Sequence, residues 1–178
     1  MVNAQHFLDV IIADFRATKQ LGERAMAQLR DDEMDWSPDG ESNSIAIIVK
    51  HLSGNMISRW TDIFTTDGEK PDRNRDTEFE GAASSRAEVM EQWERGWGKL
   101  METLESLRPE DLERTILIRG QGHTVVQAII RQTSHYAYHV GQMVFLAKHL
   151  RSEGWQTLSV AKGKSEEFNR QMLASKNP

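Results

Sequence analysis

Apolar side chains recur at steps of three and four residues through most of this sequence, a spacing that gathers them on one face of an α-helix. Four helices are expected, over about Asn3–Arg30, Asn43–Phe64, Ser85–Leu107 and Thr124–Arg151. The last two begin with capping-box spacing, in which a Ser or Thr is followed three residues later by Glu or Gln. Four helices of this length predict an all-α fold, a four-helix bundle.

The segments between these helices are rich in glycine, proline and polar residues, which favour loops. Residues 65–83 are expected to form a long crossover between the second and third helices, and residues 107–123 a short irregular connection. The polar residues from 152 onward are expected to form an irregular C-terminal tail. Because domains average about 150 residues, the 178 residues are expected to form a single domain, 1–178.

Charge and composition exclude several classes of function. Twenty-two basic against 27 acidic residues leave a net charge of −5 without a concentrated basic cluster, so no nucleic-acid partner is expected. The absence of cysteine excludes disulfides, thiolate metal ligands and cysteine nucleophiles. Charged residues interrupt the apolar stretch near the N-terminus, and no uncharged apolar run reaches the 18 residues of a membrane span. A cytoplasmic protein with no membrane partner is therefore expected.

His135 and His139 are the first candidate metal ligands. They are four residues apart on the fourth expected helix, so both rings project from one face and can reach one ion. The 16 residues between Arg131 and Lys148 carry no formal charge, which favours a buried helix and neutral imidazoles. No Glu follows His135, which excludes the helical His-Glu metalloprotease motif.

The second expected helix carries a matching polar column that includes His51, Asn55 and Asp62. If the second and fourth helices are neighbours, His51 completes a set of three nitrogen ligands and leaves a coordination position open for chemistry. The competing interpretation is that these histidines are core residues whose nitrogens bind neighbouring groups. His6, His123 and His149 are assigned structural roles, as are three of the five tryptophans, Trp60, Trp93 and Trp97. The charged segment 67–80 is read as a solvated loop, although long loops often carry function.

An ordered series of motifs resembles the DinB/YfiT-like family of metalloenzymes, in a largely uncharacterised bacterial branch. The series includes IVKHLSGN at 48–55, TDGEKP at 66–71, RNRD at 73–76, HYAYHVGQ at 135–142 and WQTLS at 155–159. It covers nearly the whole chain. One departure is visible in the tail, where Val160 and Ala161 stand in place of the expected Ile-Pro.

The resemblance implies a four-helix bundle whose metal ligands are His51, His135 and His139. It also implies a divalent ion, zinc or nickel above all, and thiol S-transferase or hydrolase chemistry on a small-molecule substrate, with a low-molecular-weight thiol as a candidate partner. Four polar residues would then orient the histidines or the substrate: Asn55, Arg59, Arg131 and Gln142. Two alternatives remain open, namely a non-catalytic metal-binding or stress-response bundle and a helical interaction protein. The sequence supplies no convincing general base.

A homodimer is expected as well, both from the resemblance and from the apolar character of the fourth helix. This helix is too apolar to leave a face in water, and a two-fold interface would bury what one core leaves uncovered. In the alternative interpretation, the long crossover and the C-terminal tail cover that surface within one chain.

Overall fold

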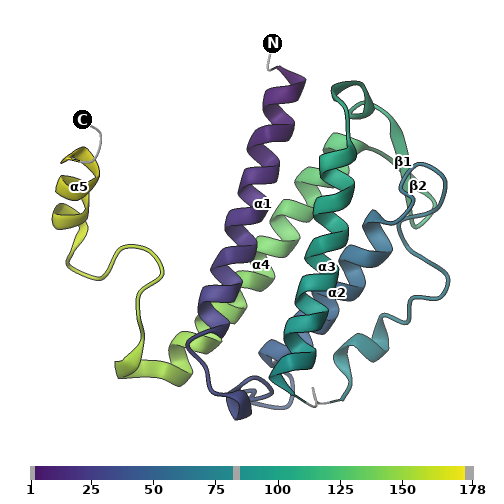
Figure 1. Ribbon diagram of the computed structural model, residues 1–178. Coiled ribbons are helices and arrows are strands. Elements are labelled where there is room, and N and C mark those ends of the chain that lie inside the picture. The colour runs from purple at the N-terminus through teal and green to yellow at the C-terminus, as the bar shows by residue number, and fades with distance from the viewer. Residues whose placement is uncertain (1–2, 82–84, 175–178) are drawn as a thin grey trace.

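A computed structural model describes residues 3–81 and 85–174 of the chain. The last two residues of the expected crossover, Ala82 and Ala83, lie outside the described residues. The described part is mostly helical, and its five α-helices are labelled in Figure 1. They are α1 (Ala4–Met26), α2 (Ile45–Trp60), α3 (Arg86–Ser106), α4 (Val125–Arg151) and α5 (Ser165–Ala174).

Side-chain caps start the four long helices where local sequence signals favour it. Asn3 caps α1 by accepting a hydrogen bond from the Gln5 amide, and Ser44 and Ser85 cap α2 and α3 in the same way. Thr124 opens α4 with the predicted capping box, complete in both directions. The predicted ends of the first two helices are wrong by about four residues. After Trp60 the backbone becomes extended at Thr61 and reaches a positive φ of 48° at Asp62, so helical hydrogen bonding stops there.

The four long helices pack side by side around one apolar core (Figure 1). α2 lies along α3 and α1 lies along α4, while contacts between α2 and α4 bring the two pairs together. The centre of the core is aromatic: the Trp97 ring lies 5.3 Å from Trp93 and 5.8 Å from Tyr136, centroid to centroid. Trp60, Trp93 and Trp97 are each about 1% exposed, which confirms their packing roles.

The connection expected to be irregular between α3 and α4 contains a β-hairpin, so the all-α prediction fits the mostly helical structure only roughly. β1 (Thr115–Ile118) pairs antiparallel with β2 (Gln121–Thr124), with Ile118 opposite Gln121. The two-residue turn, Arg119–Gly120, has positive φ at both positions (55° and 73°), the geometry that matches strand twist. The hairpin rests on the core through Ile116 and Ile118, which are 3% and 2% exposed.

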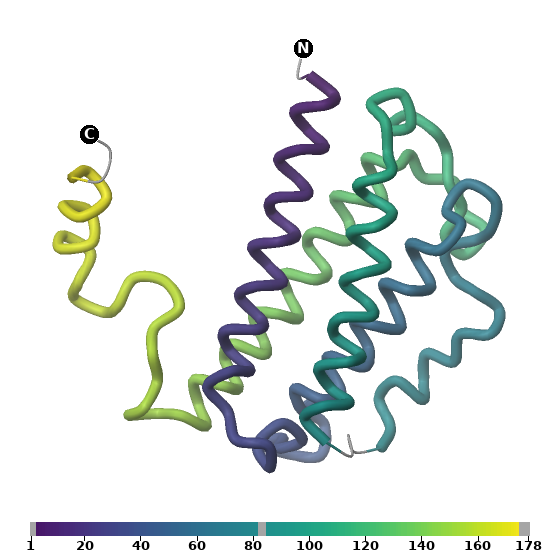
Figure 2. Tube along the Cα trace, viewed as in Figure 1, coloured from purple at the N-terminus to yellow at the C-terminus, as the bar shows by residue number. Residues whose placement is uncertain are grey.

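The tail is also more regular than predicted, because residues 165–174 form the helix α5. In Figure 2 the chain leaves α4 and carries α5 away from the four long helices. Every residue of α5 is exposed. None of the described helices is both long and apolar enough to cross a membrane.

Candidate metal centre

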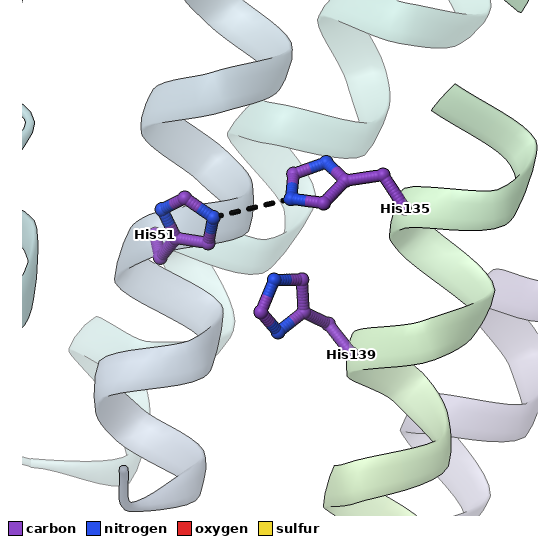
Figure 3. A group of neighbouring side chains, drawn as sticks. All are labelled: His51, His135 and His139. Atoms are coloured by element: carbon purple, nitrogen blue, oxygen red, sulfur yellow. Dashed lines mark hydrogen bonds between the residues drawn. The ribbon is translucent and has the colours of Figure 1, made fainter. Parts of the chain in front are cut away.

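Three histidines from two helices meet between α2 and α4. His51 comes from α2, and His135 and His139 come from successive turns of α4 (Figure 3). One ring nitrogen from each histidine lies within 4.8 Å of the others, and the Nε2 atoms of His51 and His135 are 3.3 Å apart. This buried group could hold a metal ion.

Each of the three rings has its Nδ1 atom fixed by an oxygen acceptor. Nδ1 of His51 donates to the Glu78 carboxylate at 2.8 Å, that of His135 to the Gln132 amide oxygen at 3.2 Å, and that of His139 to the Gln142 amide oxygen at 2.8 Å. Since these oxygens can only accept, the proton of each neutral ring resides on Nδ1. The Nε2 lone pairs are therefore available to a cation, as in metal sites with oriented imidazoles.

Burial keeps the imidazoles of His135 and His139 uncharged. Desolvation, followed by the neighbouring His139 and His51 rings and then by nearby arginines, lowers the pKa of His135 to about 3. Desolvation, followed by the electrostatic interaction with the neighbouring His51 ring, lowers the pKa of His139 to about 4. Both rings are neutral near pH 7, which is the protonation state that binds metals.

The spacing of the nitrogens fits a tetrahedral ion. Two nitrogens each about 2.0–2.1 Å from tetrahedral zinc lie about 3.3–3.4 Å apart. The separation of 3.3 Å between the Nε2 atoms of His51 and His135 meets this requirement. Three imidazoles, with no fourth ligand grouped with them in the described residues, match the donor set of a catalytic rather than a structural zinc site.

Glu78 is the residue that positions His51, and it lies in the segment that was read as a solvated loop. That reading is wrong for Arg73 and Glu78, whose side chains are only 5% and 8% exposed. Arg73 donates to both Glu78 oxygens at 2.8 Å. Burial alone would raise the pKa of Glu78, but the hydrogen bonds from His51 and Arg73 hold that pKa below its usual value. The carboxylate is thus charged and can anchor the His51 ring.

Gly54 makes room for that carboxylate. Glu78 lies in a short 3₁₀-helix, residues 76–79, that packs against α2. A Cβ atom added at Gly54 would lie only 2.9 Å from the Glu78 Cδ atom. The absence of a side chain at this position therefore lets the carboxyl approach α2 closely enough to reach His51.

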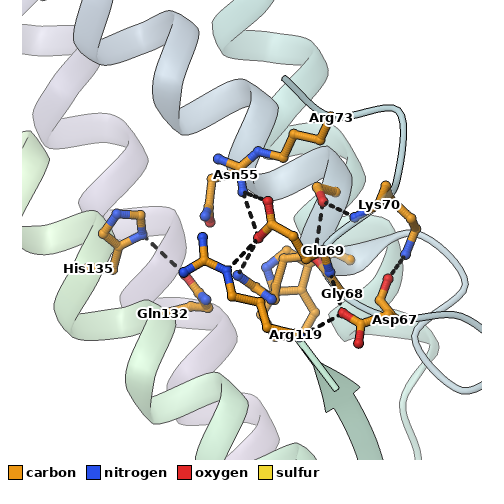
Figure 4. A network of polar contacts seen from close by, with 12 residues as sticks. Asn55, Asp67, Gly68, Glu69, Lys70, Arg73, Arg119, Gln132 and His135 are labelled. Atoms are coloured by element: carbon orange, nitrogen blue, oxygen red, sulfur yellow. Dashed lines mark hydrogen bonds and ion pairs between the residues drawn. The ribbon is translucent and has the colours of Figure 1, made fainter. Parts of the chain in front are cut away.

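The long crossover is fastened to the hairpin beside the histidines (Figure 4). Asp67 accepts hydrogen bonds from the backbone amides of Arg119 and Gly120, at 2.8 and 2.7 Å. The amide of Glu69, followed by these two amides, lowers the pKa of Asp67. Glu69 pairs with Arg73 at 3.3 Å and with Arg119 at 3.2 Å. These contacts fix the loop that carries Arg73 and Glu78.

A cavity of about 420 Å³ opens onto the three histidines. Asn55, Arg59 and Arg131, three of the residues predicted to orient the ligands or the substrate, line this cavity. Asn55 is itself held by the buried Tyr136 hydroxyl, which donates to Asn55 Oδ1 at 3.1 Å. Gln142 does not line this cavity and instead orients His139.

Several residues of the site were not predicted from the sequence as functional. Gln132 orients His135, Tyr136 holds Asn55, and Arg73 and Glu78 brace His51. Gln132 is three residues before His135 on α4, so helical spacing was a usable signal for it. For Glu78 no local signal existed, since it is 27 residues from His51 in the sequence.

Fold and site together define a mostly helical protein with a buried three-histidine group that could hold a metal ion. The family model described as "Protein of unknown function (DUF1572)" matches residues 2–164, and the chain therefore belongs to the DUF1572 family. A search of the curated proteins finds no match.

Proposed function

We propose that this protein is a divalent-metal-dependent enzyme built on a four-helix bundle of the DinB/YfiT-like type. The observation that carries the proposal is the arrangement of His51, His135 and His139, whose Nε2 atoms converge while each Nδ1 atom is held by an oxygen acceptor. Histidines that only pack in a core have no need for three Nε2 atoms that converge while each Nδ1 atom is held by an acceptor. Zinc or nickel suits three imidazole ligands.

The proposed chemistry is thiol S-transfer or hydrolysis on a small molecule. A bound divalent ion with an open position would lower the pKa of water or of a thiol and so supply a nucleophile at neutral pH. The chain's own residues shape the reaction space: Tyr136 fixes Asn55, and Arg59 and Arg131 line the cavity beside the histidines. Glu78 is not the general base, because His51 and Arg73 already engage its carboxylate oxygens. Asp62 is exposed and does not line the cavity.

Two measurements test this function. The first is the metal content of protein purified without a histidine tag, for which we expect about one divalent ion per chain. The second is turnover of an electrophilic dye with a panel of low-molecular-weight thiols, before and after chelation. Activity that disappears with chelator and returns with zinc or nickel supports the enzyme. Stoichiometric metal without turnover supports the non-catalytic metal-binding alternative, and absence of metal contradicts both.

We also propose that the protein is a homodimer that associates through α4. Ile130, Tyr138 and Phe145 project from one side of this helix and are 53%, 63% and 71% exposed. A single chain therefore leaves part of α4 uncovered, which is what the homodimer hypothesis requires, and the described parts of the crossover and the tail do not cover these side chains. A contiguous apolar helix face is typical of an interface, and a two-fold axis would bury it.

A further inference from the structure

The cavity beside the three histidines is lined by arginines. Among the described residues, its walls include five guanidinium groups and no carboxylate; the five are Arg59, Arg73, Arg75, Arg119 and Arg131. The whole chain has a net charge of −5, so the cavity is positively charged in a protein that is acidic overall. Clefts lined by one sign of charge concentrate ligands of the opposite sign.

Arg59 is the most informative of the five. Its side chain is only 3% exposed, and its nearest carboxylate oxygen, on Glu69, is 3.7 Å away. Its Nε and Nη1 atoms are buried and have no hydrogen-bond partner among the described residues. A buried guanidinium with unmet donors costs free energy, and an incoming acceptor would recover it.

Two other guanidiniums of the cavity have no carboxylate partner within the described residues. Neither Arg131 nor Arg75 forms an ion pair within the described part of the chain. The guanidinium carbon of Arg75 lies over the Phe79 ring, 5.0 Å from its centroid. Arg73 and Arg119 differ, because Glu69 and Glu78 already pair with them. Arg75 and Arg131 therefore have no carboxylate partner in the described residues, and Arg59 has only the 3.7 Å pair with Glu69 and two donors without a hydrogen-bond partner.

We propose that the substrate of this site carries an oxyanion, a carboxylate or a phosphate, which Arg59 and Arg131 bind beside the histidine group. The inference rests on the proposed function, since it specifies the substrate of the same site. Guanidinium groups favour planar and tetrahedral oxyanions because they donate two parallel hydrogen bonds. A cationic substrate would be repelled by the arginines, and a neutral one would leave their positive charge uncompensated.

Direct binding to metal-free protein tests the proposal without depending on turnover. The protein is stripped with chelator, dialysed into chelator-free buffer of low ionic strength at pH 7.5, and titrated calorimetrically with inorganic phosphate and, separately, with malonate. The test variants are Arg59→Gln and Arg131→Gln. The matched control is Arg24→Gln, which removes the same charge at an exposed residue lining a different cavity.

We expect one oxyanion to bind per wild-type chain, with affinity that falls as salt is added. Each test variant should bind about tenfold more weakly, the loss of one charge-assisted contact, while Arg24→Gln should stay within about twofold of wild type. The stronger of the two probes indicates whether the substrate group is a phosphate or a carboxylate. If Arg59→Gln fails to fold, Arg131→Gln carries the comparison, because Arg131 is exposed.

The proposal is overturned if wild-type protein binds neither probe, or if Arg24→Gln weakens binding as much as Arg131→Gln does. These outcomes differ from failure of the proposed function, which appears as absence of a bound divalent ion or of metal-dependent turnover. If the protein binds an oxyanion but takes up no metal, the oxyanion-site proposal stands and the proposal of a metal-dependent enzyme is contradicted.

Discussion

The Nε2 atoms of His51 and His135 lie 3.3 Å apart, and the Nδ1 atom of each ring donates to an oxygen. With the proton of each neutral ring on Nδ1, two lone pairs face each other at this short distance. A cation between them removes the repulsion, and three imidazoles around one ion form an open coordination sphere. The predictions below follow from this relationship and from the groups that maintain it.

His135→Ala is expected to abolish metal binding and leave the helices intact. The core is large enough to fold without an ion, unlike that of a zinc finger. The metal-free variant should keep its helical circular dichroism and unfold at the same or a slightly higher temperature, because a polar group beside the apolar core is removed. His149→Ala, at a histidine that stacks on Trp36, is the control and should keep the metal. Cooperative unfolding of His135→Ala at room temperature would mean that the site is structural.

Glu78→Gln is expected to weaken metal binding about 10- to 100-fold, the range seen when a group that orients a ligand histidine is lost. The substitution removes the charge that His51 and Arg73 share. Competition with a chromogenic chelator measures the affinity. Glu80→Gln removes the same charge at an exposed position two residues away and should bind metal like wild type. Equal affinities in the two variants would show that Glu78 does not position His51.

Gly54→Ala is expected to cost about 1–3 kcal/mol of unfolding free energy and to reduce metal affinity, because the new methyl group would displace the Glu78 carboxyl. Gly98→Ala on α3 is the matched control. Nothing lies within 4 Å of a Cβ at Gly98, so helix propensity should make that variant about 0.5–1 kcal/mol more stable. Urea unfolding measures both. An unchanged stability in Gly54→Ala would remove the argument for close packing against α2.

Acid is expected to destabilise the metal-free protein from about pH 6.5 downward. The folded-state pKa values of His135 and His139, about 3 and about 4, lie below the 6.5 of an unperturbed imidazole. Between these values the unfolded chain binds more protons than the folded one, so stability falls as pH falls and the loss is complete only below the folded values. Urea unfolding between pH 7 and pH 4 measures the slope. The double variant His135→Ala/His139→Ala should show a shallower slope; an identical slope would contradict neutral burial of the two rings.

Phe145→Glu is expected to convert the proposed homodimer into a monomer, since it places a charge in the exposed apolar face of α4. Light scattering at several concentrations gives the mass. Val10→Glu places the same charge on α1 at a side chain that is 53% exposed, and it should leave the dimer intact. A wild-type mass equal to one chain at all concentrations would reject dimerisation.

Local signals in the sequence determined the four long helices. Asn3, Ser85 and Thr124 act as caps where their spacing to the following residues predicts, because capping depends on atoms within three residues. The pairing of His135 with His139 is equally local, since one helical turn sets it. The hairpin was missed, although Arg119–Gly120 has the positive φ values of a tight turn. Strand pairing depends on a partner, and neither four-residue strand was long enough to be recognised alone.

Tertiary structure alone decided how the site is completed. The sequence predicts a three-histidine group only if α2 and α4 are neighbours. The packing of the helices makes them neighbours and so brings His51 to His135. Glu78 and Arg73 lie in a connection without hydrophobic periodicity, whose path is fixed by the Asp67 contacts with the hairpin and by the space at Gly54. Periodicity specifies which face of a helix is buried, because that is a property of neighbouring residues. It does not specify which charged side chains far apart in the sequence a loop buries together, because the path of the loop depends on tertiary contacts with distant segments.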